Sequence, residues 1–297
     1  MIWIVGNKGM LGTELTHYLQ NQGLSVIGTD RDVSFLDPDA LSAFAQDKPI
    51  AWIINCAAYT AVDKAEDEED LALRLNAEGP ENLARLAQNI GARLLHISTD
   101  YVFSGTPQLK LDEPRPYRED DPTAPTGAYG RTKEAGERLV LAAAPNSLIV
   151  RTAWLYGAYG PNFVFTMLRL MKERDSIGVV ADQRGTPTWA RDLSAAIHGL
   201  ITKPHVPAGI YHFTNDGECT WYDFALAIRD EARRLDLLDK DCTVNPLTTA
   251  QYPTKARRPA YSVLSKDKIK ALHIPVPEWR VSLIQFLKTQ QTTTTKD

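Results

Sequence analysis

The sequence has 297 residues, enough for one large α/β domain or for a domain of about 150 residues with a smaller partner. A net charge of -4 and a pI near 5.9 give no general attraction to nucleic acid or to an anionic membrane, so we expect neither as a partner. The three cysteines are widely spaced and odd in number, which favours a reduced, cytoplasmic protein over a disulfide scaffold. The six histidines show no close ligand spacing, and we expect no bound metal.

Short apolar runs alternate with amphipathic stretches through the first half of the chain. The runs predict buried strands at Ile2–Val5, Ser25–Thr29, Ala51–Cys56, Arg93–Ser98 and Ser147–Thr152. The stretches between them predict helices at Met10–Gln22, Pro38–Gln46, Asp67–Gly91 and Ala128–Ala143. Strand–helix alternation with nearly continuous apolar strands is typical of an α/β fold with a doubly wound parallel sheet, the Rossmann arrangement.

The second half of the chain loses this regular alternation and becomes rich in turn residues. We therefore predict a larger Rossmann domain over residues 1–154, with return segments around 179–192 and 246–265. Residues 155–297 are expected to form a second, smaller α/β domain assembled from separate segments.

The first predicted strand is followed at once by a G-x-x-G-x-x-G run that opens the first helix. Gly6 allows the tight turn, Gly9 lets the backbone approach a pyrophosphate, and Gly12 lets helix and sheet pack closely. Met10 and Leu11 begin the helix, whose free N–H groups and positive dipole end would face the phosphates. Because strand, glycines and helix occur together, the run predicts a dinucleotide site.

Two adjacent charged residues at the end of the second strand bear on the choice of dinucleotide. Asp30 would accept hydrogen bonds from the adenosine ribose, which favours NADH. Arg31 could instead pair with a 2′-phosphate, which favours NADPH. The sequence leaves the choice between NADPH and NADH open.

A Y-x-x-x-K motif lies in the predicted helix Ala128–Ala143. Tyr129 and Lys133 are four residues apart and share one helix face. A free tyrosine is a poor acid at neutral pH, and a neighbouring cation, joined by an oxidised nicotinamide, would lower its pKa. Thr99 follows the fourth strand and could hydrogen-bond both a substrate carbonyl and the phenol. The three residues predict a catalytic group that donates a proton.

These motifs resemble the dTDP-4-dehydrorhamnose reductase family of the extended short-chain dehydrogenase/reductase superfamily. The resemblance runs over essentially the whole chain. It rests on the motifs already described and on the segments Asn55–Glu66, Ser98–Phe103, Arg151–Gly157, Asp182–Thr188, Thr220–Ala225 and Tyr252–Pro259.

The resemblance implies NAD(P)H-dependent reduction of the 4-keto group of dTDP-4-dehydro-β-L-rhamnose, the last step of dTDP-L-rhamnose synthesis. Tyr129 would donate the proton, with Lys133 as its electrostatic partner and Thr99 as its hydrogen-bonding partner. The smaller domain would bind the sugar nucleotide. The other implied site residues are Ala57, Ala58 and Thr60 beneath the nicotinamide half, Trp154 against the sugar, and Arg257 and Arg258 at the nucleotide diphosphate.

The sequence departs from the family pattern at two places, one near the adenine and one at the expected dimer contact. Ser34 stands before Phe35 where relatives commonly have an aspartate near the adenine. Some relatives also pair through a metal held by surface glutamates, whereas this chain has Glu14 but Arg191 at the second position. A cation there repels a metal ion, so we expect a monomer or a weak homodimer.

Three alternatives stay open to different degrees. A 4,6-dehydratase of the same superfamily needs Asp-Glu directly after the catalytic threonine, and here Thr99 is followed by Asp100-Tyr101. Another 4-ketoreductase or an epimerase differs in substrate or in cofactor turnover, which sequence does not distinguish. A non-catalytic regulatory subunit would be favoured by loss of Tyr129 or Lys133, and both are present.

Overall fold

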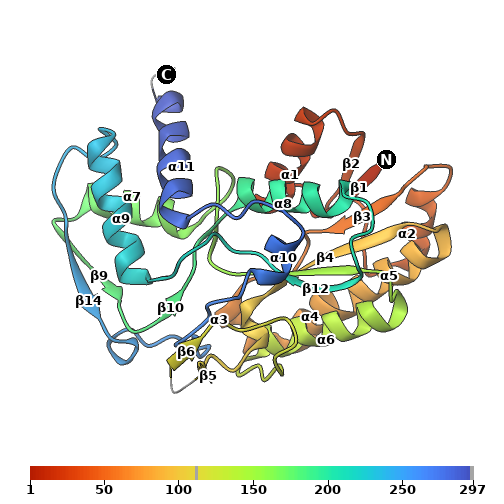
Figure 1. The fold of residues 1–297 in the computed structure, drawn as a ribbon, viewed down its shortest axis with the longest axis horizontal. Helices are drawn as coiled ribbons and strands as arrows, with labels where there is room; N and C mark the ends of the chain where they lie inside the picture. The colour runs from red at the N-terminus through yellow and green to blue at the C-terminus, as the bar shows by residue number, and fades with distance from the viewer. Residues whose placement is uncertain (111–112, 295–297) are drawn as a thin grey trace.

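The computed structural model describes residues 1–110 and 113–294, and its centre is a six-stranded sheet of parallel neighbours (Figure 1). Its strands, in spatial order, are β12 (Gly209–His212), β7 (Leu148–Thr152), β4 (Arg93–Thr99), β3 (Trp52–Asn55), β1 (Ile2–Val5) and β2 (Val26–Thr29). The chain starts at β1, moves outward to β2, and then returns to build β3, β4 and β7 on the other side. The predicted doubly wound parallel sheet is confirmed.

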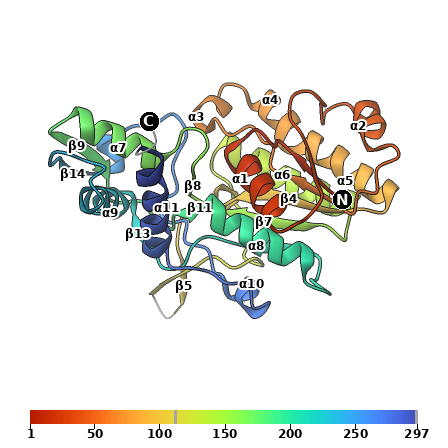
Figure 2. The same cartoon turned by 90° about the horizontal axis from the view of Figure 1, so that it is seen from above.

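Helices cover both faces of this sheet because alternate side chains of each strand point to opposite sides. Ile2 and Ile4 pack in one apolar cluster, whereas Trp3 and Val5 pack in the other. The first face is covered by α1 (Met10–Asn21) and α8 (Ala190–Thr202), and the second by α2 (Pro38–Ala45), α5 (Gly79–Ile90) and α6 (Ala128–Ala143). Figures 1 and 2 show these two groups of helices on opposite sides of the strands.

The predicted helix over Asp67–Gly91 is divided in the structure. It consists of α4 (Glu69–Leu73), a π-helical turn η1 (Arg74–Glu78) and α5, after the short helix α3 (Val62–Ala65). A π-helical turn adds a residue to the helix and often marks a functional region.

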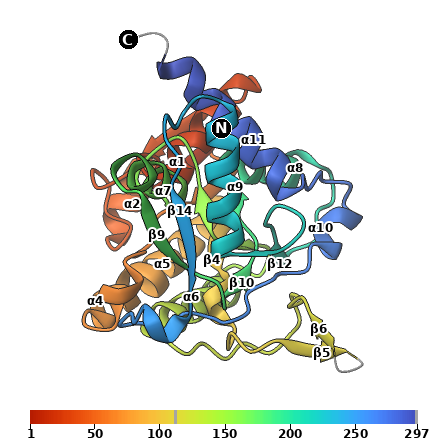
Figure 3. The same ribbon diagram turned by 90° about the vertical axis from the view of Figure 1, so that its left-hand side faces the viewer.

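A second group of helices packs beside the sheet around its own apolar core (Figure 3). It is formed by α7 (Phe163–Glu173), α9 (Trp221–Arg234) and α11 (Trp279–Thr294), with β9 (Ser176–Val180) parallel to β14 (Thr243–Leu247). Helix α9 begins at a capping box: Thr220 Oγ1 accepts the Asp223 N–H at 3.0 Å, and Asp223 Oδ2 accepts the Thr220 N–H at 2.9 Å.

The remaining elements are short and lie in the connections between the longer strands and helices. They are β5 (Gln108–Lys110), β6 (Glu113–Arg115), β8 (Leu155–Tyr156), β10 (Arg184–Gly185), β11 (Thr188–Trp189), β13 (Cys219–Thr220), α10 (Asp267–Ala271), and the 3-10 turns η2 (Asp100–Val102) and η3 (Thr249–Gln251). Within the described residues, no helix is long and apolar enough to cross a bilayer.

The second half of the chain returns to the sheet through α8 and the edge strand β12. The sequence did not predict β12, because Gly209–His212 is only four residues long and follows a turn-rich segment. By contrast, β9 and β14, which overlap the ends of the expected return segments 179–192 and 246–265, pair with each other outside the sheet. The division of the chain at residue 154 stays a prediction, and residues 295–297 of the expected second domain lie outside the described residues.

Candidate active site

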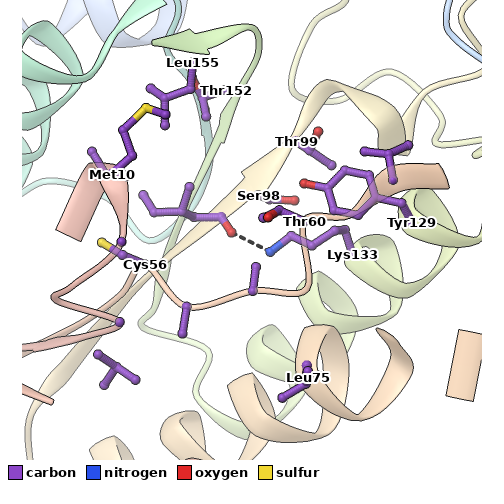
Figure 4. A pocket seen from close by; sticks show the side chains of 18 of the residues that line it. Met10, Cys56, Thr60, Leu75, Ser98, Thr99, Tyr129, Lys133, Thr152 and Leu155 are labelled. Carbon is purple, nitrogen blue, oxygen red and sulfur yellow. Dashed lines mark hydrogen bonds between the residues drawn. The ribbon is translucent and has the colours of Figure 1, made fainter. Parts of the chain in front are cut away.

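A cavity of about 710 Å³ opens where β1, β3, β4 and β7 end. The carboxyl ends of parallel strands are where ligands bind in doubly wound sheets. Thirteen of the predicted site residues line it: Gly6, Gly9, Met10, Leu11, Asp30, Arg31, Ala57, Ala58, Thr60, Thr99, Tyr129, Lys133 and Trp154. The structure therefore brings the glycine run and the Thr99–Tyr129–Lys133 group into one cavity (Figure 4).

The glycine run forms a close turn between β1 and α1. Gly6 has φ +79°, and a Cβ there would lie 2.7 Å from the Ala57 backbone nitrogen. A Cβ on Gly12 would lie 2.1 Å from the Gly6 oxygen, so Gly12 packs the helix against the loop and does not line the cavity. Met10 and Leu11 begin α1 without a side-chain cap and face the cavity. Backbone N–H groups at such a helix start fit a phosphate group.

The loop after β3 is held by two asparagines. Asn55 Oδ1 accepts the Ala57 N–H at 3.0 Å, and Asn76 Oδ1 accepts the Tyr59 N–H at 2.8 Å. Asn76 comes from the π-helical turn η1 and also donates to Thr132 Oγ1, at 3.1 Å, on α6. The loop that carries Ala57, Ala58 and Thr60 is thus tied to the helix that carries Tyr129 and Lys133.

Tyr129 and Lys133 lie one turn apart on α6 and reach into the same side of the cavity as Thr99 (Figure 4). The Thr99 hydroxyl, at the end of β4, donates to Asp100 Oδ1 at 2.9 Å and lies close to the Tyr129 phenol. Lys133 is 1% exposed, and its Nζ donates to the Ile97 carbonyl oxygen at 2.7 Å. The arrangement places a phenol and an ammonium beside one free space.

Burial shifts the pKa of both the Tyr129 phenol and the Lys133 ammonium. It raises the pKa of Tyr129 above its ordinary value, and the nearby Thr99 side chain opposes this only in part. The expected lowering of the phenol pKa is therefore outweighed in this state by desolvation, because the charged phenolate loses more hydration than the neutral phenol. Burial also lowers the pKa of Lys133 to about 8, against the opposing charge of Glu137. At neutral pH Tyr129 stays protonated, as a proton donor must.

Trp154 lies at the end of the cavity beside the second group of helices. Its φ is +48°, and its ring stacks on Trp221 with centroids 3.6 Å apart and an angle of 10°. Gly185 lies against the same ring, since a Cβ there would be 2.7 Å from it. A positive φ in a tryptophan is strained, and here the backbone turns the indole across the cavity wall.

The two predicted diphosphate residues differ. Neither Arg257 nor Arg258 lines the cavity. Arg257 is exposed, whereas Arg258 is half-buried, donating to Asp63 Oδ2 at 2.6 Å and to the Tyr101 hydroxyl at 3.3 Å. Because Tyr101 does line the cavity, Arg258 lies at its rim.

The far end of the cavity is lined by Asp30, Arg31 and the segment Ser34–Leu36, where the sequence predicted the adenosine half of a dinucleotide. Glu14 and Arg191 are near each other: burial raises the pKa of Glu14, and the charge of Arg191 lowers it. Among the described residues, no group of three or more His, Cys, Asp or Glu side chains could hold a metal ion.

Sequence reasoning missed several residues of the site. Tyr101 stands in the quoted Ser98–Phe103 motif, two residues after Thr99, which could have indicated it. Cys56, directly after β3, packs against the apolar core and also lines the cavity. Asp63 likewise lies in the quoted segment Asn55–Glu66, but its pairing with Arg258, 195 residues away, had no signal in the sequence.

Comparisons with known proteins agree with this geometry. The sequence model of the family described as RmlD substrate binding domain matches residues 1–292. A dTDP-4-dehydrorhamnose reductase of Streptomyces griseus is 46% identical over 291 residues, covering 95% of this chain and 92% of that protein. A probable dTDP-4,6-dihydroxy-2-methyloxan-3-one 4-ketoreductase of Streptomyces antibioticus is 44% identical, covering 95% and 93%.

Solved structures are similar over the same length. The dTDP-4-dehydrorhamnose reductase of Bacillus anthracis in complex with NADP has a TM-score of 0.89 and 38% identity, covering 97% of this chain and 98% of that one. Sheet, glycine turn and the Thr99–Tyr129–Lys133 group define a short-chain dehydrogenase/reductase of the extended kind. Within that class, the chain belongs to the dTDP-4-dehydrorhamnose reductase family.

Proposed function

We propose that this protein uses NADPH or NADH to reduce the 4-keto group of dTDP-4-dehydro-β-L-rhamnose, giving dTDP-L-rhamnose. The observation that carries the proposal is the single cavity that joins the glycine turn at one end to Tyr129, Lys133 and Thr99 at the other. Family membership supports the same reaction. The test is stoichiometric oxidation of NADPH or NADH when that sugar nucleotide is added.

Each residue of the site has its own role in the proposed reduction. A bound dihydronicotinamide supplies a hydride. Tyr129 donates its proton to the carbonyl oxygen that becomes the hydroxyl, and Thr99 holds the phenol in place. The Lys133 ammonium favours the phenolate that remains. Gly6, Gly9 and the free amides of Met10 and Leu11 would hold the pyrophosphate of the cofactor, and Ala57, Ala58 and Thr60 line the other wall of the cavity.

Arg31→Ala is expected to lower kcat/KM for NADPH about ten-fold while changing that for NADH much less, because a 2′-phosphate is the only extra group for the guanidinium to bind. Arg31 is exposed on the cavity rim, so the difference should shrink at high ionic strength. Steady-state kinetics with both cofactors measure it.

The neighbouring aspartate provides the matched variant. Asp30→Asn removes the charge that repels a 2′-phosphate, and the kcat/KM ratio of NADPH to NADH should rise. If Arg31→Ala lowers kcat/KM equally for both cofactors, Arg31 does not bind the phosphate.

A second candidate substrate comes from the 44% identical relative, whose name describes a 4-ketoreductase acting on another dTDP-sugar. The same catalytic group would reduce that ketone, and only the contacts at Trp154 and beyond would differ. Relative kcat/KM values for several dTDP-4-keto sugars decide between them. An epimerase would return its cofactor unchanged, and so would show no net oxidation.

We also propose that the protein acts in the cytoplasm, on small dTDP-sugar ligands, without nucleic acid or membrane, as a monomer or weak homodimer. The positive charge of Arg191, which lowers the pKa of Glu14 against the larger effect of burial, disfavours a metal ion at that glutamate.

A further inference from the structure

Buried polar side chains run beneath the active site from Asn55 through His96 to Lys133. Asn55 Nδ2 is 3.0 Å from His96 Nδ1, and His96 Nε2 is 3.3 Å from Lys133 Nζ. Asn55 and His96 are 0% exposed, on the neighbouring strands β3 and β4. Three residues from different elements thus form one chain that ends at Lys133.

The hydrogen positions in this chain follow from its first member. The Ala57 N–H can only donate, and it points to Asn55 Oδ1 at 3.0 Å. The other atom of the Asn55 amide, Nδ2, is therefore the one that faces His96, and it can only donate. His96 Nδ1 must accept, so a neutral His96 bears its hydrogen on Nε2, facing Lys133.

That orientation conflicts with a charged lysine. The Lys133 Nζ also donates to the Ile97 carbonyl oxygen at 2.7 Å. An ammonium has no lone pair, so the His96 Nε2–H would face another donor. An amine accepts this N–H and still donates to Ile97. If His96 instead carried its hydrogen on Nδ1, that N–H would face the N–H donors of Asn55 Nδ2.

We propose that His96 is a positioning residue that directs its Nε2–H at Lys133 Nζ and so favours the amine form of that lysine. Its effect is to let Lys133 exchange a proton with the site near neutral pH.

Other groups around Lys133 also shift its pKa. From its own helix, Glu137 raises the lysine pKa, as does Cys56 at the end of β3. Burial is the largest effect and lowers that pKa to about 8. Burial, followed by the charge of Lys133, also holds the pKa of His96 well below its ordinary value, so His96 stays neutral across the range in which the lysine titrates.

The kinetic consequence rests on the proposed reduction. Below a pH of about 8 Lys133 is mostly an ammonium that stabilises the phenolate, and above it this support is lost. We therefore expect kcat to fall as pH rises through about 8. In His96→Phe the opposing N–H is gone, and this fall should move upward by about one pH unit.

His212→Phe is the matched control. His212 is also 0% exposed on the same sheet, in β12, but its Nε2 faces Arg151 Nη1 at 3.4 Å and not Lys133. Both variants remove a buried imidazole of the same size. A general loss of packing would move both pH profiles alike, whereas the proposal moves only that of His96→Phe.

The deciding experiment uses NMR on the cofactor-free enzyme, and so does not depend on the reaction proposed. Imidazole ¹⁵N shifts of the wild type should show His96 protonated at Nε2 and not at Nδ1. The ¹³Cε resonance of Lys133 should titrate near 8 in the wild type and in His212→Phe, and about one unit higher in His96→Phe. An Nδ1–H tautomer in the wild type, which needs no variant to fold, would overturn the proposal. So would an unchanged or lower lysine midpoint in His96→Phe.

Discussion

Tyr129→Phe is expected to reduce kcat by about two to four orders of magnitude, the usual loss when a general acid is removed. The variant deletes one hydroxyl and keeps the ring that packs edge-on against Tyr101 at 5.4 Å. Because burial raises its pKa, the wild-type phenol is protonated at neutral pH and available to donate. Cofactor affinity should persist, since the glycine turn is untouched. Stopped-flow or steady-state rates measure kcat, and fluorescence titration with NADPH measures the affinity for the cofactor.

Tyr156→Phe provides the comparison. Tyr156 is a fully buried tyrosine of the second core, outside the cavity lining, and its hydroxyl is buried without a hydrogen-bond partner. Its loss should leave kcat within about two-fold of wild type, since it touches no reacting group. Near-normal turnover in Tyr129→Phe would remove the proposed proton donor.

Arg258→Ala is expected to raise KM for the sugar nucleotide by about ten- to a hundred-fold, because a charge-assisted arginine–phosphate contact contributes roughly 1.5–3 kcal/mol. A net charge of -4 gives the protein no general attraction for a diphosphate. Asp63 and Tyr101 hold the Arg258 guanidinium at the rim of the cavity, which limits the ordering needed on binding. Initial rates over a range of substrate concentration measure KM.

Two further variants test whether the position of Arg258 or only its positive charge matters for substrate binding. Arg257→Ala removes the same charge from the adjacent, exposed residue, and should change KM less than about three-fold. Arg258→Lys should restore part of the affinity, because a lysine lacks the planar fork. If Arg258→Ala weakens NAD(P)H binding and leaves substrate KM unchanged, the segment belongs to the cofactor site.

Local patterns in the sequence were enough for the parts of the site that lie close together along the chain. The turn from Gly6 to Gly12 depends on one strand, one turn and one helix, and Tyr129 and Lys133 depend only on the period of a helix. Their joining in one cavity follows from parallel strands ending at one edge of the sheet. For these reasons the fold and about half of the lining residues could be predicted.

Residues that act through distant partners could not be predicted in the same way. His96 lies in an apolar strand pattern that gives no sign of Lys133, 37 residues away. The link from Arg258 to Asp63 and the edge strand β12 likewise depend on how separate segments pack. The raised pKa of the Tyr129 phenol could not be predicted either, because burial is a property of the folded surroundings and not of residue spacing.

The most direct test of the proposed reaction follows the hydride itself. Enzyme, dTDP-4-dehydro-β-L-rhamnose and NADPH carrying deuterium at both positions of nicotinamide C4 are incubated, and the product is examined by NMR. We expect one deuterium at C4 of the sugar for each NADPH oxidised, in dTDP-L-rhamnose. Product formed without deuterium at that carbon, or a changed sugar without net NADPH oxidation, would contradict the account.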